Sequence, residues 1–323
     1  MLSIRLNDDN VFLRGSPDDC SGTIVSGTVV FRPSKATKVR QITLKLHGTI
    51  SVDTNQDVHG DKTTVVHRTL VLFDSSTPSN PSYQFDTQEH HFDFNLPLKG
   101  DLPESIDLPH GKVTYTLSAI VIRPFPHTNL RYSQELKIQR LCYYEAFGRL
   151  KNSARGHWKH MVQYNLSVRK SVYLAGEALA LAMSFQIEPG AQVIKVDLNL
   201  METRVYKHPG TRVTLTETFD LSKAMLMSPA QSDKMRLVIP SSANTHCSTG
   251  FISVKHCVHV RVKFMDRGGK HGYVELELPI IIQSAAQYAL ANALPDYDDI
   301  VASRDELPPA YRPRRDLRCY LYT

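Results

Sequence analysis

The chain has 323 residues, of which 41% are hydrophobic and 22% charged, and it carries a formal charge of +6 at pH 7. This length and apolar content suit a folded protein of about two domains and exclude a chain that is disordered throughout. No apolar run approaches the ~20 residues of a membrane-spanning helix, and five cysteines without a recognisable export signal favour reduced thiols in the cytosol.

Apolar and polar residues alternate with the period of a β-strand in several segments. The clearest are residues 42–46, 113–121, 196–200 and 258–264. Turn sequences rich in glycine and proline separate them, and only an alanine-rich stretch near residues 284–294 resembles a helix. The pattern predicts an all-β fold built from antiparallel β-sandwiches of immunoglobulin-like type.

Three of these elements occur twice in the same order. VFLRG at 11–15 recurs as VYLAG at 172–176, and VRQITLKL at 39–46 recurs as VIKVDLNL at 193–200. The alternating segment 113–121 has its counterpart at 258–264. An ordered repeat of this kind predicts two similar sandwiches in tandem.

Positive charge is concentrated where the two halves meet. From Lys137 to Lys170 there are eight basic residues and one acid, so this window carries +7 and the remainder of the chain −1. A positive patch suits acidic cytosolic tails or anionic lipid headgroups, although a solvated strand edge or linker would have the same composition. The candidate patch residues are Arg149, Lys151, Arg155, Lys159, Arg169 and Lys170.

We expect four regions: an N-terminal sandwich at 1–145, a basic linker at 146–160, a second sandwich at 161–285 and a disordered tail at 286–323. The last 30 residues are rich in charge and proline and have no strand or helix period. No basic–aromatic motif of a nucleic-acid-binding domain accompanies the basic window, so nucleic acid is not an expected partner.

Two tyrosine motifs lie in the tail. Leu307-Pro308-Pro309-Ala310-Tyr311 contains a PPxY sequence, and Leu294-Pro295-Asp296-Tyr297 is a weaker LPxY variant. Consecutive prolines favour the polyproline II conformation that the aromatic groove of a WW domain binds, with a second pocket for the tyrosine. The predicted WW-binding residues are Leu307, Pro308, Pro309, Tyr311, Leu294, Pro295 and Tyr297.

Catalytic and metal-binding motifs are not apparent. The histidines and cysteines at 246–247 and 256–259 lack the spacing of a zinc site, for which four converging ligands are needed. We find no nucleophile elbow, no phosphate-binding glycine loop and no paired catalytic carboxylates. The sequence therefore predicts a protein that is not an enzyme and has no metal or other cofactor.

The assembled features resemble the arrestin family. Residues 111–124 (GKVTYTLSAIVIRP) and the VFLRG segment are similar to the arrestin N-lobe, and residues 172–178 (VYLAGEA) and 275–282 (ELELPIII) to the C-lobe. The pair LPxY…LPPxY resembles the tail of the α-arrestins, including the arrestin-related trafficking adaptors of fungi.

This resemblance implies a cytoplasmic adaptor that is recruited to the plasma membrane and endosomes. Its PY motifs would bind a WW-domain HECT ubiquitin ligase, and its lobes would engage the cytosolic tails of membrane transporters or receptors, which are then ubiquitinated, internalised and sorted. The resemblance also implies self-ubiquitination and peripheral contact with anionic membrane as possibilities.

Two other functions fit the same sequence. An arrestin-type signalling scaffold, for ambient pH or nutrient sensing, would share the fold without a role in cargo degradation. A β-sandwich lipid-binding module or enzyme with an incidental PPxY sequence is the third reading.

Overall fold

The computed structural model describes residues 1–8, 10–18, 20–53, 62–75, 82–141, 150, 152–207 and 214–292. Met1–Ala291 form one compact unit and Asn292–Thr323 a second. Among the described residues, no helix has the length and apolar character needed to cross a membrane.

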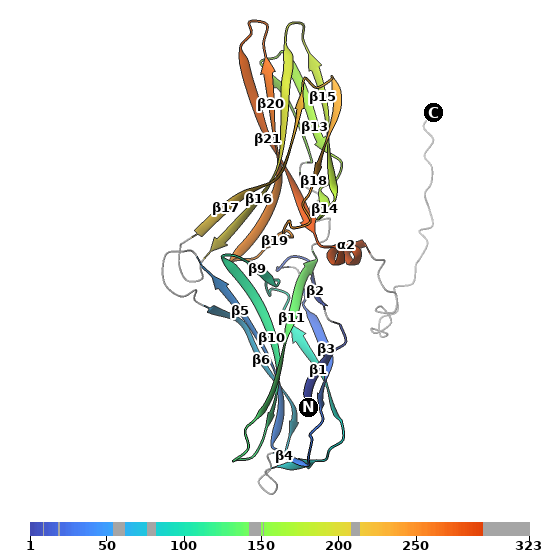
Figure 1. Cartoon of the computed structure of the whole chain (residues 1–323), viewed down its shortest axis with the longest axis vertical. Coiled ribbons are helices and arrows are strands. Elements are labelled where there is room, and N and C mark those ends of the chain that lie inside the picture. The colour runs from blue at the N-terminus through green and yellow to red at the C-terminus, as the bar shows by residue number, and fades with distance from the viewer. Residues whose placement is uncertain are drawn as a thin grey trace, which may run out of the picture. The chain divides into compact units, whose positions relative to one another are not determined.

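The first half of the larger unit, which we call the N-lobe, is a sandwich of two main sheets (Figure 1). A three-stranded sheet has the order β1-β3-β8, a six-stranded sheet has the order β2-β11-β10-β5-β6 with β9 beside β10, and β4 pairs with β7. The strands are β1 (Leu2–Leu6), β2 (Asn10–Arg14), β3 (Thr23–Phe31), β4 (Thr37–Val39), β5 (Gln41–Val52), β6 (Lys62–Asp74), β7 (Tyr83–Phe85), β8 (His90–Leu98), β9 (Ile106–Leu108), β10 (Gly111–Ile122) and β11 (Leu130–Leu141).

The second half, the C-lobe, repeats this plan. A four-stranded sheet has the order β12-β13-β15-β18, and a six-stranded sheet has the order β14-β21-β20-β16-β17 with β19 beside β20. Its elements are β12 (Ser153–Trp158), β13 (Val162–Val168), β14 (Val172–Leu174), β15 (Ala178–Ile187), β16 (Gln192–Lys207), β17 (Thr214–Met227), β18 (Ser232–Val238), β19 (Cys247–Ser248), β20 (Ile252–Met265), β21 (His271–Gln283) and the helix α2 (Ala285–Asn292).

Period-two alternation produces both cores. On β10 every second side chain from Val113 to Val121 is buried, and on β20 the same holds from Val258 to Phe264. The side chains of one face therefore meet those of the facing sheet, which is the arrangement that stabilises a sandwich. The predicted fold class, two tandem β-sandwiches of arrestin type, is confirmed.

The internal repeat is confirmed by the strand order. The segments at 11–15 and 172–176 overlap β2 and β14, which take the same edge position, each parallel to the last strand of its lobe. The segments at 39–46 and 193–200 lie largely in β5 and β16, and those at 113–121 and 258–264 lie in β10 and β20, again at equivalent positions.

Two expected region boundaries differ from the structure. Residues 153–158, expected in a linker, form β12 and pair with β13, because Ala154 and Trp158 turn inward as sheet residues do. The helix α2 extends into the region expected to be tail, since Gln287 is buried and hydrogen-bonded to the N-lobe. The C-lobe therefore starts earlier than expected, and a helix occupies residues 285–292 of the region expected to be tail.

The strand β16 contributes to both lobes. Leu198 and Leu200 lie in the C-lobe core, whereas Tyr206, near the other end of the strand, packs in the N-lobe core together with Ile252 of β20. Register shifts at Val193/Lys195 and Leu200/Met201 mark irregular positions along it, and bulges of this kind bend a strand. A 16-residue strand is thus part of the connection between the lobes.

Candidate binding surfaces and the seam between the lobes

The predicted WW-binding residues, from Leu294 to Tyr311, lie outside the described residues. The described chain leading to them is α2, whose first turn is closed by a reciprocal pair of hydrogen bonds. The amide of Gln287 donates to Ser284 Oγ (3.1 Å), and the amide of Ser284 donates to Gln287 Oε1 (2.9 Å). This capping box satisfies donors that a helix start otherwise leaves unpaired.

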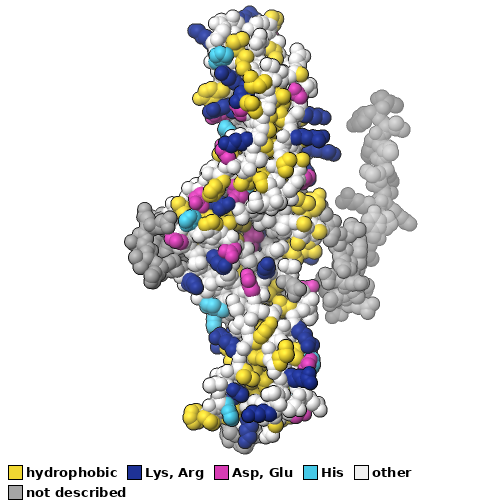
Figure 2. Space-filling model, viewed as in Figure 1, with side chains coloured by type: hydrophobic (Ala, Val, Ile, Leu, Met, Phe, Trp, Pro, Cys, Tyr) yellow, Lys and Arg dark blue, Asp and Glu magenta, His cyan; other side chains and the backbone are white. Residues whose placement is uncertain are grey.

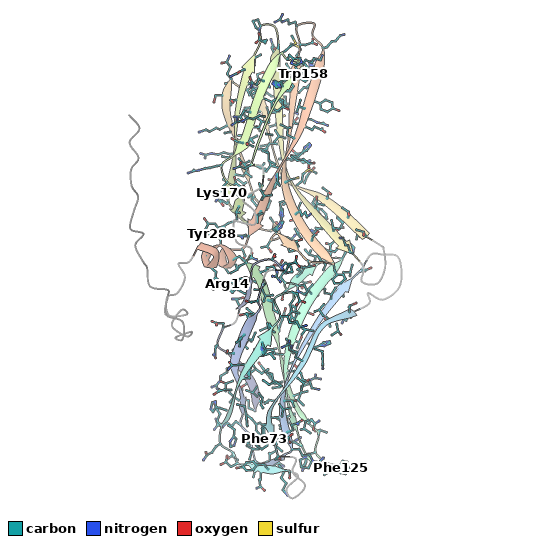
Figure 3. The ribbon with its side chains drawn as sticks, turned by 180° about the vertical axis from the view of Figure 1, so that it is seen from behind. Arg14, Phe73, Phe125, Trp158, Lys170 and Tyr288 are labelled. Carbon is teal, nitrogen blue, oxygen red and sulfur yellow. The ribbon has the colours of Figure 1, made fainter. Side chains whose placement is uncertain are left out.

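The same glutamine fixes α2 to the N-lobe. Gln287 Nε2 donates to the backbone carbonyl of Arg140 at 3.2 Å. On the C-lobe side, the Lys170 ammonium lies 6.0 Å from the ring centroid of Tyr288 (Figure 3). The helix is therefore held by contacts to both lobes just before the chain reaches Leu294.

The predicted basic patch is described only in part, and its four described cations have different surroundings. Arg149 and Lys151 lie outside the described residues. Lys159 forms an ion pair with Asp266 (2.9 Å) and lies over the Trp158 ring, and Arg155 donates from Nε to Asn165 Oδ1 (3.2 Å). Two of the predicted cations thus have structural partners within the C-lobe, although both Arg155 and the Lys159 side chain keep substantial exposure.

The other two predicted cations line a surface cavity of about 450 Å³. Arg169 is exposed there, and Lys170 forms an ion pair with Glu177 at 2.5 Å. Arg236 of β18 enters the same cavity, because its backbone pairs with Ala180 on the neighbouring strand. Figure 2 shows Lys and Arg side chains projecting from the edge of the C-lobe that carries β13, β15 and β18.

The shape of this cationic cavity follows from the sequence of β15. Ala178 and Ala180 present only methyl groups to the cavity, while longer cationic side chains rise on either side. Three cations and one carboxylate line it, and the carboxylate is already paired. The cavity is therefore suited to an anionic group rather than to a neutral or cationic one.

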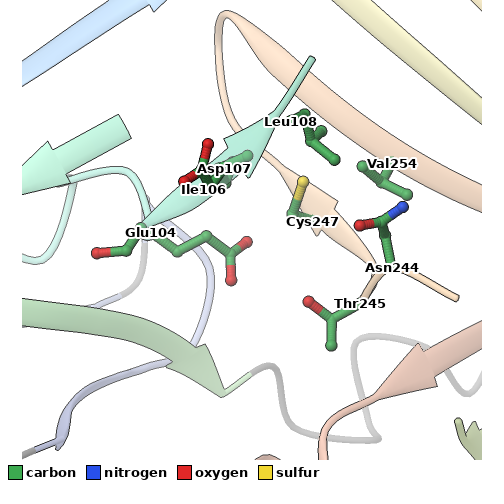
Figure 4. Close-up of a pocket in the computed structure, with 9 residues that line it drawn as sticks. Glu104, Ile106, Asp107, Leu108, Asn244, Thr245, Cys247 and Val254 are labelled. Carbon is green, nitrogen blue, oxygen red and sulfur yellow. The ribbon is translucent and has the colours of Figure 1, made fainter. Parts of the chain in front are cut away.

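A second cavity, of about 100 Å³, lies at the seam between the lobes (Figure 4). The N-lobe lines it with residues 104–108 and the C-lobe with Asn244, Thr245, Cys247 and Val254. Burial raises the pKa of the Cys247 thiol far above its usual range, so this cysteine is protonated and unreactive at neutral pH. The cavity therefore has no activated nucleophile.

Glu104 is the buried carboxyl group of this seam cavity. Burial raises its pKa to about 7, and the positive charge and backbone amide of Arg140 oppose that shift only in part. Desolvation disfavours the charged form of a carboxylic acid. Glu104 therefore exchanges its proton near neutral pH.

Arg140 is a buried cation whose guanidinium donates its hydrogen bonds to neutral carbonyl groups, and its charge also acts on Glu104. Its Nη1 donates to Gly15 O at 2.9 Å, and its Nη2 donates to Gly100 O and Leu102 O, both at 2.7 Å. It belongs to the basic window, yet it is only 7% exposed. Its guanidinium stabilises buried carbonyls of the N-lobe, so its charge contributes little to a surface patch.

Glu202 is the buried anion on the C-lobe side of the seam. Its oxygens accept hydrogen bonds from Arg204 Nε (2.6 Å) and from the amide and side chain of Asn244 (3.1 and 2.9 Å), and one lies 3.0 Å from His256 Nε2. Burial would raise the pKa of Glu202, but the combined hydrogen bonds from His256, Asn244 and Arg204 outweigh it and lower the pKa to about 2. Glu202 is therefore ionised at physiological pH.

Apolar contacts close the rest of the seam. A Cβ atom on Gly111 would lie 2.7 Å from Ile252 Cδ1 and 2.9 Å from Tyr206 Cδ1. Only glycine lets β10 approach the C-lobe strands this closely. The seam thus combines a tight apolar contact with buried ionisable groups.

The histidine and cysteine segments considered for zinc do not converge. His256 is buried against Glu202, whereas Cys257 and His259 lie on the opposite face of β20. Within the described ranges, no group of three or more metal-ligating side chains is close enough to hold an ion, and Cys20, Cys247 and Cys257 are free thiols.

Sequence reasoning missed the residues whose partners are remote in the chain. Arg236 completes the cationic cavity from a different strand than Arg169, and the partners that bury Arg140 and Glu202 include residues far away in the chain. The one local signal was the Glu202-Thr203-Arg204 sequence, whose two charged side chains share a face of β16.

Comparison with known proteins gives matches to both lobes. The family model described as arrestin (or S-antigen), N-terminal domain, matches residues 14–144, and that for the C-terminal domain matches residues 158–287. Protein ROD1 of Saccharomyces cerevisiae is 21% identical over 262 residues, covering 62% of this chain and 31% of ROD1. Arrestin domain-containing protein C31A2.12 of Schizosaccharomyces pombe is 24% identical over 185 residues, covering 54% of this chain and 31% of that protein. The matched region spans about a third of the length of these curated relatives.

Proposed function

Because the chain belongs to the arrestin family, in its arrestin-related (α-arrestin) branch, we propose that it is a non-enzymatic adaptor between a WW-domain HECT ubiquitin ligase and plasma-membrane transporters or receptors. The ligase would ubiquitinate the bound cargo and direct its endocytosis and sorting. The adaptor would reside in the cytoplasm and be recruited to the plasma membrane and endosomes.

The PPxY sequence carries the ligase half of this proposal. Consecutive prolines such as Pro308 and Pro309 favour polyproline II, the conformation that a WW domain binds, and this preference would lower the entropy lost on docking. Tyr311 then fills a pocket of the WW domain. Tyr297 adds a second, weaker contact 14 residues earlier (311 − 297), at a reach of about 20 Å for a flexible chain.

The cationic cavity supports the cargo half. Arg169 and Arg236 line it, and the one carboxylate among its lining residues is paired with Lys170. Acidic residues in the cytosolic tail of a transporter or receptor match this charge. The attraction acts over short range, because salt screens exposed charges beyond about 8 Å at physiological ionic strength.

Titration of the full chain with tandem WW domains and with a Glu/Asp-rich peptide tests the proposal. Tyr311→Ala should weaken WW binding roughly thirtyfold, about 2 kcal/mol, and Tyr297→Ala should weaken it less. The Arg169→Glu/Arg236→Glu variant is the matched control: it should keep WW affinity and lose the acidic peptide at low salt. Undiminished WW binding by Tyr311→Ala would refute the ligase half.

A further inference from the structure

Phe125 is the most exposed large hydrophobic residue of the described chain, at 93%. It lies in the loop that joins β10 to β11, at the end of the N-lobe marked in Figure 3. An isolated apolar side chain on a surface is common. The construction of this loop and the charge around it distinguish Phe125 from such a case.

Internal hydrogen bonds hold the loop in one conformation. The Arg123 amide donates to Asn129 Oδ1 at 3.1 Å, the Arg123 side chain donates from Nε to Thr128 O at 2.6 Å, and the His127 amide donates to Pro124 O at 3.0 Å. Prolines precede and follow Phe125 and restrict the backbone further. The phenyl ring is therefore presented by a loop that needs little further ordering to bind.

Phe125 stays apart from an aromatic cluster at the same end of the lobe, since it is 93% exposed (Figure 3). Phe85 contacts Phe31, Phe73 and Phe92 with ring centroids 5.8, 5.0 and 6.0 Å apart. Phe73 also meets Tyr83. Phe125 points to solvent rather than joining this cluster, which leaves its apolar area for an external contact.

Exposed cations lie near the loop and outnumber the acids named at this end of the lobe. The Arg40 amide bonds to Ile122 O at the base of the loop, and Arg131 pairs across the ladder with Ile120. Arg40 and Arg131 are exposed, as are Lys35 and Lys38. The acids Asp74 and Asp86 at this end accept hydrogen bonds from Gln41 and from the Gln88 amide. Figure 2 shows yellow and dark-blue side chains gathered at this end of the N-lobe.

We propose that this end of the N-lobe docks on an anionic phospholipid surface, with Phe125 inserted at the interface and Arg40 and Arg131 on the headgroups. Aromatic rings favour the membrane–water interface, and cations near an anionic leaflet add to the attraction. One ring with a few cations gives reversible binding, as for other peripheral contacts. The inference is independent of the ligase and cargo contacts proposed above.

The tryptophan content of the chain permits a direct test. The sequence has one tryptophan, Trp158, which is 7% exposed and stacked on Phe264 at 5.0 Å. In full-length Phe125→Trp protein, the second tryptophan starts in water, so its emission should shift to the blue on phosphatidylcholine vesicles that contain phosphatidylserine. Brominated lipid should quench it, and vesicles of phosphatidylcholine alone should have a much smaller effect.

Binding variants complete the test. Phe125→Ala should weaken vesicle binding roughly tenfold, the lower end of the range for burying a phenyl group. Arg40→Gln and Arg131→Gln should weaken it about fivefold per charge, and added salt should remove that difference. Tyr273→Ala, which removes an exposed ring of the C-lobe, is the matched control and should bind like the unaltered chain.

Two results would overturn the membrane proposal. One is Phe125→Trp emission that does not change on phosphatidylserine vesicles. The other is Phe125→Ala protein that binds those vesicles normally but no longer binds a purified protein partner, which would assign the loop to a protein contact. Circular dichroism of each variant should match the unaltered chain, because none of the substituted side chains is buried.

Discussion

Each side of the seam between the lobes buries one ion, and the two ions are satisfied in different ways. Arg140 donates to three backbone carbonyls, which remain neutral at every pH. Glu202 instead depends on the side chains of Arg204, His256 and Asn244. The hydrogen bonds of the N-lobe cation are thus independent of pH, although the charge of the neighbouring Glu104 changes near pH 7. The C-lobe anion is satisfied mainly by other side chains.

The largest expected effect comes from removing the N-lobe ion. Arg140→Met leaves the carbonyls of Gly100 and Leu102 buried without this donor, so unfolding free energy should fall by about 3–5 kcal/mol. Urea denaturation of the full chain, followed by circular dichroism, measures this loss. As a control, Lys137→Met at an exposed position of the same strand should change the free energy of unfolding by no more than about 0.5 kcal/mol. An equally small effect of Arg140→Met would show that the hydrogen bonds of Arg140 contribute little.

Glu202→Gln should have the next largest effect and lower the free energy of unfolding by about 3 kcal/mol near pH 7. The pKa of Glu202 lies below its usual value, at about 2, so its ionisation stabilises the fold above about pH 4.5 and this contribution is lost as pH falls toward 2. The urea midpoint of the unaltered chain should therefore drop over that range, and the variant should lack this part of the slope. Glu275→Gln, which removes a largely exposed pair with Arg261, is the control and should keep the slope.

Glu104→Gln should have a smaller effect of opposite sign. The Glu104 pKa is raised from 4.5 to about 7, so the unaltered fold is penalised as pH rises through this range. The free energy of unfolding of the variant should exceed that of the unaltered chain by about 1–3 kcal/mol at pH 8 and by almost nothing at pH 4.5. Parallel urea titrations at the two pH values decide this, and a gain of equal size at both would show that the carboxyl group is not titrating.

Much of the fold was predictable because its signals are local. Alternation at residues 113–121 and 258–264 identified two central strands, and the repeat identified two lobes. The boundaries of the expected regions were harder to predict from the sequence. The strand β12 lies in a polar, basic stretch, and only its pairing with β13 identifies it as a strand.

The binding surfaces were less predictable because they depend on cross-strand neighbours. The basic window contained Arg169, but not Arg236, which reaches the same cavity through the pairing of β15 with β18. The basic window also includes Arg140, which is buried because it contacts Gly15 and Gly100, two residues far away in sequence. Net charge along a chain does not report which cations face solvent. The PY motifs remain predictions, since they lie outside the described residues.

The parallel strand at the edge of each lobe has a consequence for synthesis. Asn10 of β2 pairs with Lys137 of β11, a separation of 127 residues (137 − 10), and Val172 of β14 pairs with Ile281 of β21, a separation of 109 (281 − 172). Neither ladder can form until the ribosome has released the later strand. Because pairings of such long range fold slowly and leave strand edges open, we expect each lobe to pass through a period on the ribosome in which chaperones protect its unpaired edge.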